Sequence, residues 1–311
     1  MKVLVTRTLP GKALDRLRER GLEVVVHQGL FLPREELLRK VEGAVGLIPT
    51  VEDRIDAQVM ERAKTLRVIA CYSVGVDHVD LEAARARGIR VTHTPEALTA
   101  ATADLTLALL LAVARRVVEG VDYARQGQWQ AWHPELLLGL DLEGLTLGIV
   151  GMGRIGQAVA QRAEAFGLRV AYTSRQPKPL PYPRLSLEEL LETADIVSLH
   201  APLTPETHRL MNRERLWAMK RGAILLNTAR GGLVDTLALV EALEGHLFGA
   251  GLDVTDPEPL PPDHPLYRRP NAVITPHMGS AGRRTRERMA EMAVENLLAV
   301  LEGREPPNPV V

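Results

Sequence analysis

Residues 146–156 read TLGIVGMGRIG, an apolar run that ends in a turn with three glycines. The run has the composition of a buried strand, and the residues that follow, 154–166, have helical spacing. A strand, a GxGxxG turn and a helix in this order form a site for the pyrophosphate of a dinucleotide, because the helix N-terminus presents free N–H groups. A further predicted strand at 169–173 completes the unit at the expected spacing.

Each glycine of this turn has its own steric reason. Gly151 allows the tight turn, Gly153 lets a pyrophosphate approach the backbone, and Gly156 lets the helix pack closely on the strand. Arg154 and Ile155 lie between the second and third glycines, where the helix begins. We predict that these five residues bind the cofactor.

The end of the second strand distinguishes NAD from NADP. NAD-binding units usually place an Asp or Glu there, about 20 residues after the glycines, to bind the ribose hydroxyls. This chain has Ser174 at that position and Arg175 after it, with no carboxylate in 172–176. A guanidinium is a fork-shaped partner for a 2′-phosphate. We therefore predict NADP(H) as the preferred cofactor and NAD(H) as a possible one; in the alternative, Arg175 is a solvated loop arginine.

Composition excludes several classes of protein. A chain of 311 residues exceeds what one hydrophobic core usually supports, so we expect two domains. With 38 Lys and Arg against 39 Asp and Glu, no overall field draws the chain to nucleic acid or to a membrane surface. The apolar stretch 105–114 is half of what a membrane span needs.

The single cysteine and the N-terminal sequence indicate a compartment. Cys71 alone can form neither an intrachain disulfide nor a cysteine zinc cluster. Residues 1–9 lack the long apolar region and cleavage site of a signal peptide. We expect a cytoplasmic protein, and we predict no metal site.

Strands and helices alternate on both sides of one long helical stretch, 99–125. The predicted strands are 2–6, 22–26, 44–48, 67–72 and 89–93 before it, and 146–150, 169–173, 195–200, 223–227, 249–254 and 272–275 after it. Apolar strands separated by helices indicate βαβ units and parallel sheets. The sequence therefore predicts two α/β sheets separated by one continuous helix, with a last helix at 280–302.

Three predicted strands of the second sheet are followed by side chains suited to acid–base chemistry and anion binding. Arg230 follows 223–227, Glu258 follows 249–254, and His277 follows 272–275. Because the carboxyl ends of parallel strands meet at one edge, where open α/β sheets bind ligands, we expect the three side chains to converge there.

Five ordered motifs resemble those of the D-2-hydroxyacid dehydrogenase family over nearly the whole chain. They are SVGVDHVD at 73–80, the GxGxxG turn, NTARGG at 227–232, LDVTDPEP at 252–259 and TPHMGS at 275–280. Within the family, the runs SRQPKP and PEPLPPDHP are most similar to the glyoxylate/hydroxypyruvate reductases. The resemblance implies two doubly wound parallel α/β domains. A Rossmann cofactor domain, 98–282, would be inserted into a flavodoxin-like substrate domain made of 1–97 and 283–311.

The resemblance also implies a role for each candidate residue. His277 would be the general acid/base that protonates the carbonyl oxygen, and Glu258 would orient its ring and favour the imidazolium. Arg230 would bind the substrate carboxylate, together with the backbone N–H groups of Val74 and Gly75. Further residues expected along the cofactor are His200, Pro202, Thr228, Ala229, Asp253, His277 and Gly279.

The implied reaction is the NADPH-dependent reduction of a small anionic 2-keto acid to a D-2-hydroxy acid, with glyoxylate or hydroxypyruvate as substrate. Two alternatives remain: another dehydrogenase of the family, acting on 3-phosphoglycerate, D-lactate or phosphite, and a dinucleotide-sensing regulator with the same fold. The resemblance further implies a homodimer formed through the helix and loop of 99–140. Trp132 in that loop would either line the partner's substrate pocket or pack on a neighbouring helix.

Overall fold

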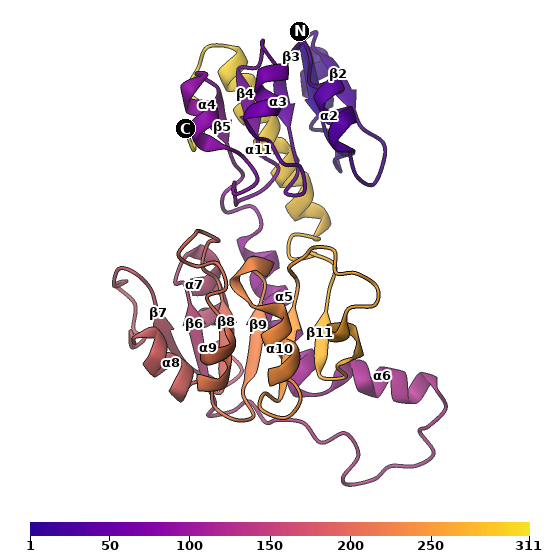
Figure 1. The fold of residues 1–311 in the computed structure, drawn as a ribbon, viewed down its shortest axis with the longest axis vertical. Helices are drawn as coiled ribbons and strands as arrows, with labels where there is room; N and C mark the ends of the chain where they lie inside the picture. The colour runs from indigo at the N-terminus through magenta and orange to yellow at the C-terminus, as the bar shows by residue number, and fades with distance from the viewer. The chain divides into compact units, whose positions relative to one another are not determined.

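The computed structural model describes all 311 residues, which form two compact units (Figure 1). Unit 1 comprises Met1–Leu98 and Ser280–Val311, and unit 2 comprises Thr99–Gly279. Each unit has a sheet of parallel strands only, with helices on both of its faces. The predicted fold class, two doubly wound parallel α/β domains, is confirmed.

Unit 1 has five strands in the order β2-β1-β3-β4-β5. The strands are β1 (Lys2–Val5), β2 (Glu23–Val26), β3 (Ala44–Ile48), β4 (Val68–Ala70) and β5 (Arg90–Thr92). The helices are α1 (Asp15–Glu19), α2 (Arg34–Lys40), α3 (Ala57–Arg62), α4 (Leu81–Ala86) and α11 (Arg283–Leu301). This strand order is the flavodoxin-like one, with its switch point between β1 and β3.

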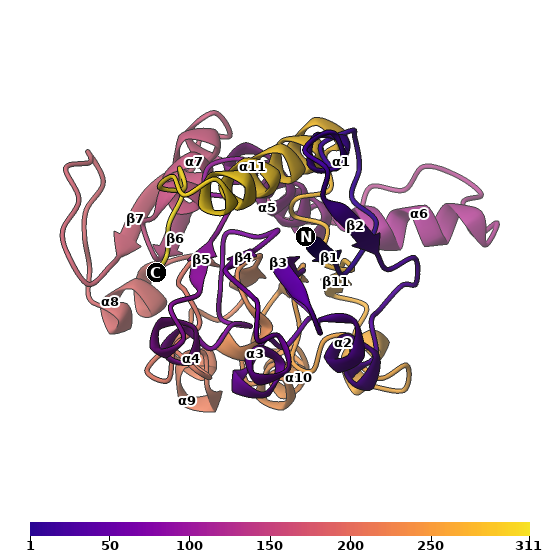
Figure 2. The same ribbon diagram turned by 90° about the horizontal axis from the view of Figure 1, so that it is seen from above.

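The sheet of unit 1 is covered on both faces, which is why its strands are apolar throughout. Figure 2 shows α1 and α11 on one face, and α2, α3 and α4 on the other. α11 fits its face closely, because a Cβ on Gly46 of β3 would lie 2.9 Å from the Leu297 side chain. The buried Asn296 of the same helix donates to the His93 carbonyl oxygen (3.0 Å). The last helix of the chain is thus part of the first unit.

Unit 2 has six strands in the order β11-β10-β9-β8-β6-β7. The strands are β6 (Thr146–Val150), β7 (Arg169–Thr173), β8 (Ile196–Leu199), β9 (Ile224–Asn227), β10 (Gly249–Leu252) and β11 (Ala272–Ile274). A single parallel bridge pairs Tyr172 of β7 with Arg184, and this bridge takes the place of a third strand in chain order. Counted with that bridge, the order becomes the 3-2-1-4-5-6 arrangement of a Rossmann unit, extended by one strand.

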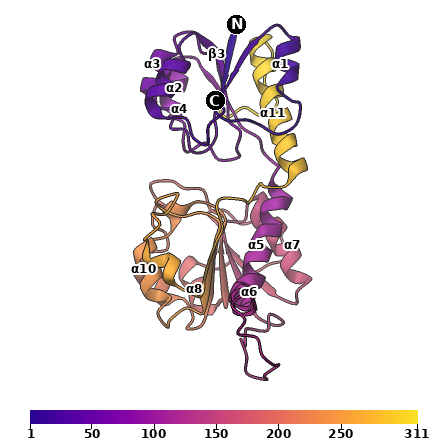
Figure 3. The same cartoon turned by 90° about the vertical axis from the view of Figure 1, so that its right-hand side faces the viewer.

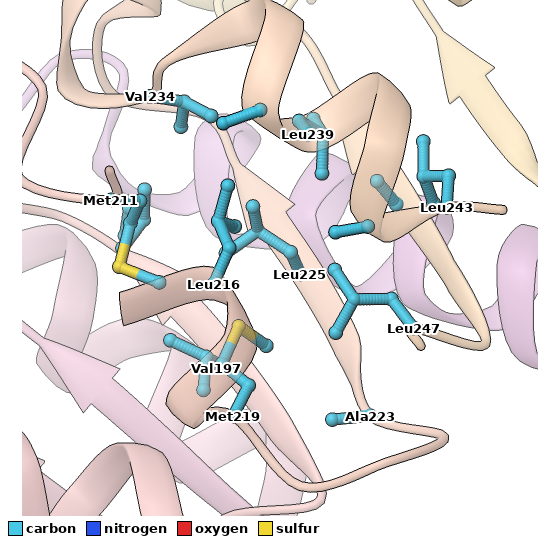
Figure 4. Close-up of a cluster of buried hydrophobic side chains, with 14 of the residues drawn as sticks. Val197, Met211, Leu216, Met219, Ala223, Leu225, Val234, Leu239, Leu243 and Leu247 are labelled. Atoms are coloured by element: carbon cyan, nitrogen blue, oxygen red, sulfur yellow. The ribbon is translucent and has the colours of Figure 1, made fainter. Parts of the chain in front are cut away.

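The helices of unit 2 lie on both faces of its sheet. They are α5 (Thr99–Ala114), α6 (Val117–Arg125), α7 (Arg154–Glu164), α8 (Leu187–Thr193), α9 (Arg213–Ala218) and α10 (Thr236–Ala242), with short 3₁₀ turns η1 (Gly231–Leu233) and η2 (Pro265–Arg268). Figure 3 shows α5 and α7 on one face and α8 and α10 on the other. On the second face, Val197 and Leu225 of the strands pack against Leu216 and Leu239 of α9 and α10 (Figure 4).

The predicted continuous helix over 99–125 is wrong: α5 ends at Ala114 and α6 begins at Val117. Between them Arg116 has left-handed backbone angles, with a φ of 51°. The Ala114 carbonyl oxygen accepts from the Leu140 N–H (2.8 Å) in place of a residue one turn further along the helix. A Cβ on Gly139 would lie 2.2 Å from the same oxygen. The returning chain at 139–140 therefore ends the helix.

None of the helices is both long enough and apolar enough to cross a lipid bilayer.

Candidate active site

The glycine-rich turn joins β6 to α7 at the carboxyl edge of the unit 2 sheet. Gly151 has a φ of +97°, and a Cβ there would lie 2.6 Å from backbone atoms of His200. A Cβ on Gly156 would lie 2.4 Å from the Gly151 carbonyl oxygen, so a side chain would push the helix off the turn. At Gly153 a Cβ would meet no protein atom within 4 Å. Gly153 is thus the glycine whose missing side chain leaves room for a pyrophosphate at the N-terminus of α7.

Ser174 and Arg175 follow β7 and are held in place by Arg184. Arg184 Nη2 donates to the carbonyl oxygens of Ser174 (2.9 Å) and Arg175 (3.3 Å). Ser174 Oγ donates to the Gln176 carbonyl oxygen (2.5 Å), and the Arg175 side chain is exposed. The segment from Ser174 to Arg184 contains no carboxylate, whereas Arg175, Lys178 and Arg184 are cationic. The turn is therefore braced from within and positively charged, as a phosphate site requires.

His200 follows β8 and supports the glycine-rich turn from the neighbouring strand. The backbone N–H of His200 donates to the Val150 carbonyl oxygen (2.7 Å), and the ring Nε2 lies 2.8 Å from Ser198 Oγ. Desolvation of the imidazole lowers the pKa of His200 to about 4, so the ring is neutral near pH 7. Pro202 is exposed, and its carbonyl oxygen accepts from the Thr207 hydroxyl (2.7 Å). His200 is thus a neutral brace beside the turn rather than a proton donor.

The turn after β9 carries Arg230. Asn227, fully buried at the end of the strand, donates from Nδ2 to the Arg230 carbonyl oxygen (2.8 Å) and accepts from the Ala229 N–H (3.1 Å). Arg230 Nη1 donates to the Ala229 carbonyl oxygen (2.8 Å). A Cβ on Gly231 would lie 1.8 Å from the Thr255 carbonyl oxygen, so only glycine fits there. The backbone that presents the Arg230 guanidinium is therefore fixed on both sides.

Asp253 holds the turn after β11. Its buried carboxylate accepts from the Thr275 hydroxyl (2.6 Å), the Met278 N–H (2.7 Å) and the Gly279 N–H (2.7 Å). Its carbonyl oxygen accepts from the His277 N–H (2.9 Å). His277 itself has a φ of 49°, a left-handed conformation that non-glycine residues seldom adopt and that occurs at functional sites. Asp253 thus fixes the backbone from which the His277 ring projects.

His277 and Glu258 form a hydrogen-bonded pair. His277 Nδ1 lies 2.5 Å from Glu258 Oε1, and each side chain is 32% exposed. The second carboxylate oxygen of Glu258 accepts from the Thr255 N–H (3.3 Å). Because an ionised carboxylate only accepts, Nδ1 carries a hydrogen in this pair, and Nε2 remains for a ligand. A partly exposed imidazole oriented by a carboxylate is a suitable general acid/base.

Arg230 and His277 are brought to one edge by the sheet itself. β9, β10 and β11 are neighbours and parallel, so the turns that follow them share the carboxyl edge (Figure 1). β6, which leads into the glycine-rich turn, ends at the same edge. Thr228 and Ala229 belong to the Arg230 turn, and Gly279 belongs to the His277 turn. One edge of the sheet therefore carries a turn that can bind a dinucleotide, a cation that can bind an anion (Arg230), and an imidazole that can donate a proton (His277).

Val74 and Gly75 lie in unit 1, after β4 at the carboxyl edge of its own sheet. The Val74 carbonyl oxygen lies 2.9 Å from His93 Nδ1, and the Gly75 carbonyl oxygen accepts from Ser73 Oγ (2.7 Å). These contacts orient the peptide groups of the segment, and the substrate-binding role of its N–H groups stays a prediction.

Trp129 and Trp132 lie on the long loop that follows α6 (Figure 1). Their exposed fractions are 68% and 83%, so neither ring packs on a helix of its own chain. α6 has no buried residue either. Of the two alternatives for Trp132, packing on a neighbouring helix does not occur within this chain, and a place in a partner's substrate pocket stays a prediction.

Four residues of the site were not predicted from the sequence. Asn227 and Arg184 brace the turns that carry Arg230 and Arg175, as described above. In α5, the Thr102 hydroxyl donates to the Gly279 carbonyl oxygen (3.2 Å), and the Thr106 hydroxyl is bonded to the Thr228 hydroxyl (2.8 Å). The two threonines, one helical turn apart in a predominantly apolar helix, were the available signal.

Comparison with known proteins gives a family match across unit 2. Residues 107–279 match the model of the D-isomer specific 2-hydroxyacid dehydrogenase, NAD binding domain. The glyoxylate reductase of Thermofilum pendens is 49% identical, in an alignment that covers 98% of this chain and 93% of that protein.

Solved structures match over the whole chain. The TT0316 protein from Thermus thermophilus is 86% identical, with a TM-score of 0.98 and full coverage of both chains. The NADPH-dependent glyoxylate/hydroxypyruvate reductase from Sinorhizobium meliloti, in complex with NADP and malonate, is 34% identical. Its TM-score is 0.90, and the match covers 100% of this chain and 96% of that one.

Proposed function

The chain belongs to the D-isomer specific 2-hydroxyacid dehydrogenases, and on this basis we propose that it reduces glyoxylate and hydroxypyruvate with NADPH as the preferred hydride donor. The products would be glycolate and D-glycerate. The observation that carries the proposal is the His277–Glu258 hydrogen bond at the sheet edge that also bears Arg230 and the glycine-rich turn. At this edge, one small 2-keto acid could receive a proton from His277, bind through its carboxylate to Arg230, and lie beside a dinucleotide bound at the glycine-rich turn.

His277 is the proposed proton donor. In the reduction, Nε2 gives its proton to the carbonyl oxygen while a hydride is added to the carbonyl carbon, which yields the hydroxyl of the product. Glu258 keeps the ring in one orientation through Nδ1 and favours the charged imidazolium that precedes the transfer. In the reverse direction the neutral ring accepts the hydroxyl proton.

Arg230 is the proposed carboxylate anchor. Its guanidinium can form a bidentate, charge-assisted pair, which suits a planar 2-keto carboxylate. The Asn227 and Gly231 contacts hold the backbone of this turn, so the cation is presented in one place. The backbone N–H groups of Val74 and Gly75 in unit 1 are predicted to bind the same carboxylate.

The glycine-rich turn is the proposed site of the cofactor, which when bound supplies the hydride for the carbonyl carbon. Gly151, Gly153, Arg154, Ile155 and Gly156 would hold the pyrophosphate at the N-terminus of α7. The remaining contacts are proposed for His200, Pro202, Thr228, Ala229, Asp253, His277 and Gly279.

Preference for NADPH rests on the turn after β7. Arg175 has an exposed guanidinium on a backbone braced by Arg184, and no carboxylate competes within the segment from Ser174 to Arg184. A 2′-phosphate would find a cation there, whereas the 2′-hydroxyl of NADH would lack its usual carboxylate partner.

A homodimer is part of the proposal. Val117, Val118 and Val121 of α6 are each more than 40% exposed, and the loop that follows carries the exposed Trp129 and Trp132. An amphipathic helix with no buried residue needs a partner, and a second copy would cover both α6 and the loop. In such a dimer Trp132 would line the substrate pocket of the other subunit. Analytical ultracentrifugation of the chain and of Val118→Glu tests this: a dimer that the substitution dissociates supports it, and a monomeric wild type refutes it.

The test of the reaction is an NADPH oxidation assay over a panel of acids, with identification of the product. The proposal expects turnover of glyoxylate and hydroxypyruvate and D-glycerate as the product of the latter. The same panel is also assayed in the reverse direction, with NAD+ or NADP+ as the hydride acceptor. Turnover only there, with 3-phosphoglycerate, D-lactate or phosphite, would identify a different dehydrogenase, and cofactor binding without turnover in either direction would identify a sensor. A cytoplasmic location is expected for this metabolic role.

A further inference from the structure

Two buried threonines of α5 contact the two turns that carry the proposed chemistry. Thr102 and Thr106 are 4% and 0% exposed. Thr106 Oγ1 lies 2.8 Å from Thr228 Oγ1, and Thr228 precedes Arg230 by two residues. Thr102 Oγ1 donates to the Gly279 carbonyl oxygen (3.2 Å), and Gly279 follows His277 by two residues. One helix is therefore hydrogen-bonded to both turns.

The direction of the bond between Thr106 and Thr228 follows from a count of hydrogens. Thr106 Oγ1 donates to the carbonyl oxygen of Thr102 (2.8 Å), which can only accept. A hydroxyl has a single hydrogen, so in the other contact Thr106 Oγ1 must be the acceptor. The Thr228 hydroxyl is therefore the donor, and its hydrogen is directed at α5.

These hydroxyls do not serve packing alone. The other buried residues of α5 are Ala103, Leu107, Leu109, Leu110, Val113 and Ala114. A threonine in a helix interior is less favourable than an alanine or leucine, and burial of its hydroxyl costs free energy unless the hydroxyl is bonded. Each of the two threonines has a bond partner in a turn that carries Arg230 or His277.

Each turn also has a brace of its own, and α5 connects the two. Asn227 fixes the shape of the Arg230 turn, and Asp253 fixes the shape of the His277 turn. The two braces are also joined to each other, because the Asp253 N–H donates to the Asn227 carbonyl oxygen (2.9 Å), and α5 is a second connection between the turns. Thr102 and Thr106 lie on one rigid helix, about 6 Å apart along its axis by the rise of 1.5 Å per residue, and they bond one turn each.

We propose that Thr102 and Thr106 are positioning residues, which fix the placement of Arg230 relative to His277 through α5. This inference rests on the proposed function, in which Arg230 holds the carboxylate and His277 protonates the carbonyl oxygen of one substrate. A displacement of about 1 Å in such an arrangement can cost on the order of 10² in rate.

Kinetics of matched variants test the proposal. Thr106→Val keeps the shape of the side chain and removes the bond to the Arg230 turn, so KM for glyoxylate should rise roughly 3- to 10-fold with a smaller change in kcat. Thr102→Val loosens the His277 turn, so kcat should fall roughly 3- to 10-fold with a smaller change in KM. Thr106→Ser restores the hydroxyl and should restore KM. The double variant Thr106→Val/Thr228→Val should match Thr228→Val alone, because the bond between α5 and the Arg230 turn is absent from both.

The control is Thr193→Val on α8, where the hydroxyl makes the same kind of bond to the carbonyl oxygen four residues earlier (Glu189, 2.5 Å) but contacts neither turn. Its kinetic constants should equal those of the wild type. Kinetic constants equal to those of the wild type in both Thr106→Val and Thr102→Val would overturn the inference. It would also be overturned if both variants changed kcat and KM to the same extent and Thr106→Ser did not restore KM. A wild type inactive on glyoxylate would instead refute the proposed function.

A second readout does not depend on activity. Amide hydrogen exchange should become faster in residues 228–233 of Thr106→Val and in residues 277–280 of Thr102→Val, and should not change in either segment of Thr193→Val. Unchanged exchange in both segments of both variants would show that the threonines do not hold the turns, and the inference would fall whatever the substrate.

Discussion

His277 Nδ1 lies 2.5 Å from Glu258 Oε1, although the two residues follow different strands of the unit 2 sheet. The carboxylate takes one ring nitrogen and leaves the other for a substrate. Glu258→Gln keeps the side-chain shape and an acceptor oxygen but removes the charge that favours the imidazolium. In glyoxylate reduction we expect kcat to fall roughly 10- to 100-fold. A kcat equal to that of the wild type would remove Glu258 from the mechanism.

Arg230 should control substrate affinity through the carboxylate. Arg230→Ala should raise KM for hydroxypyruvate roughly 10- to 100-fold, because a charge-assisted pair is lost. Arg230→Lys should recover part of the loss, since it keeps the charge without the fork. Hydroxyacetone, which lacks the carboxylate, provides the comparison: the preference for hydroxypyruvate over hydroxyacetone should collapse in Arg230→Ala. If that preference survives, the carboxylate is held elsewhere.

Arg175 should set the choice of cofactor. Arg175→Ala should lower the ratio of kcat/KM for NADPH to that for NADH roughly 10- to 100-fold, because a phosphate loses its cation. Arg184→Ala should lower the ratio less, since Arg184 acts through the carbonyl oxygens of Ser174 and Arg175. Arg213→Ala, which removes an exposed arginine paired with Glu241 on the same unit, is the control. An unchanged ratio in Arg175→Ala would make Arg175 a solvated loop residue.

His200 should make the folded protein sensitive to acid. Its pKa is lowered to about 4, below the ordinary value of 6.5, so the unfolded chain binds the proton more tightly than the folded one. The contribution of the neutral ring to stability is complete above about pH 6.5 and is lost as the pH falls toward 4, by up to about 3 kcal/mol. Urea unfolding of the wild type and His200→Asn between pH 7 and 4.5 measures this. The wild type should lose more stability over that range, and parallel pH curves would contradict the assignment.

The fold could be predicted from the sequence because parallel strands covered on both faces are apolar along their whole length. Runs such as 146–150 and 44–48 match the strands residue for residue. The break after Ala114 could not be predicted, because it depends on the N–H of Leu140, which returns from a distant part of the chain. A helix boundary set by such a contact leaves no local signal.

The site shows the same division. The residues expected after strands β9 and β11 lie there because chain order and parallel pairing determine which strand ends share an edge. The bracing residues were not predictable, since a buried Thr106 or Asn227 resembles ordinary core until its partner is known. Asp253, expected along the cofactor, has a carboxylate that accepts three hydrogen bonds from the His277 turn, a role that depends on geometry alone.

The most direct test of the account compares two histidine variants in one assay, the NADPH-dependent reduction of glyoxylate. His277→Asn removes the proposed acid, whereas His246→Asn changes a histidine that stacks on Trp217 and precedes β10, at the opposite edge of the sheet. We predict that kcat falls on the order of 10²- to 10⁴-fold in His277→Asn and stays within about twofold of the wild type in His246→Asn. A His277→Asn enzyme that keeps more than about a tenth of the wild-type kcat would contradict the central claim that this imidazole delivers the proton.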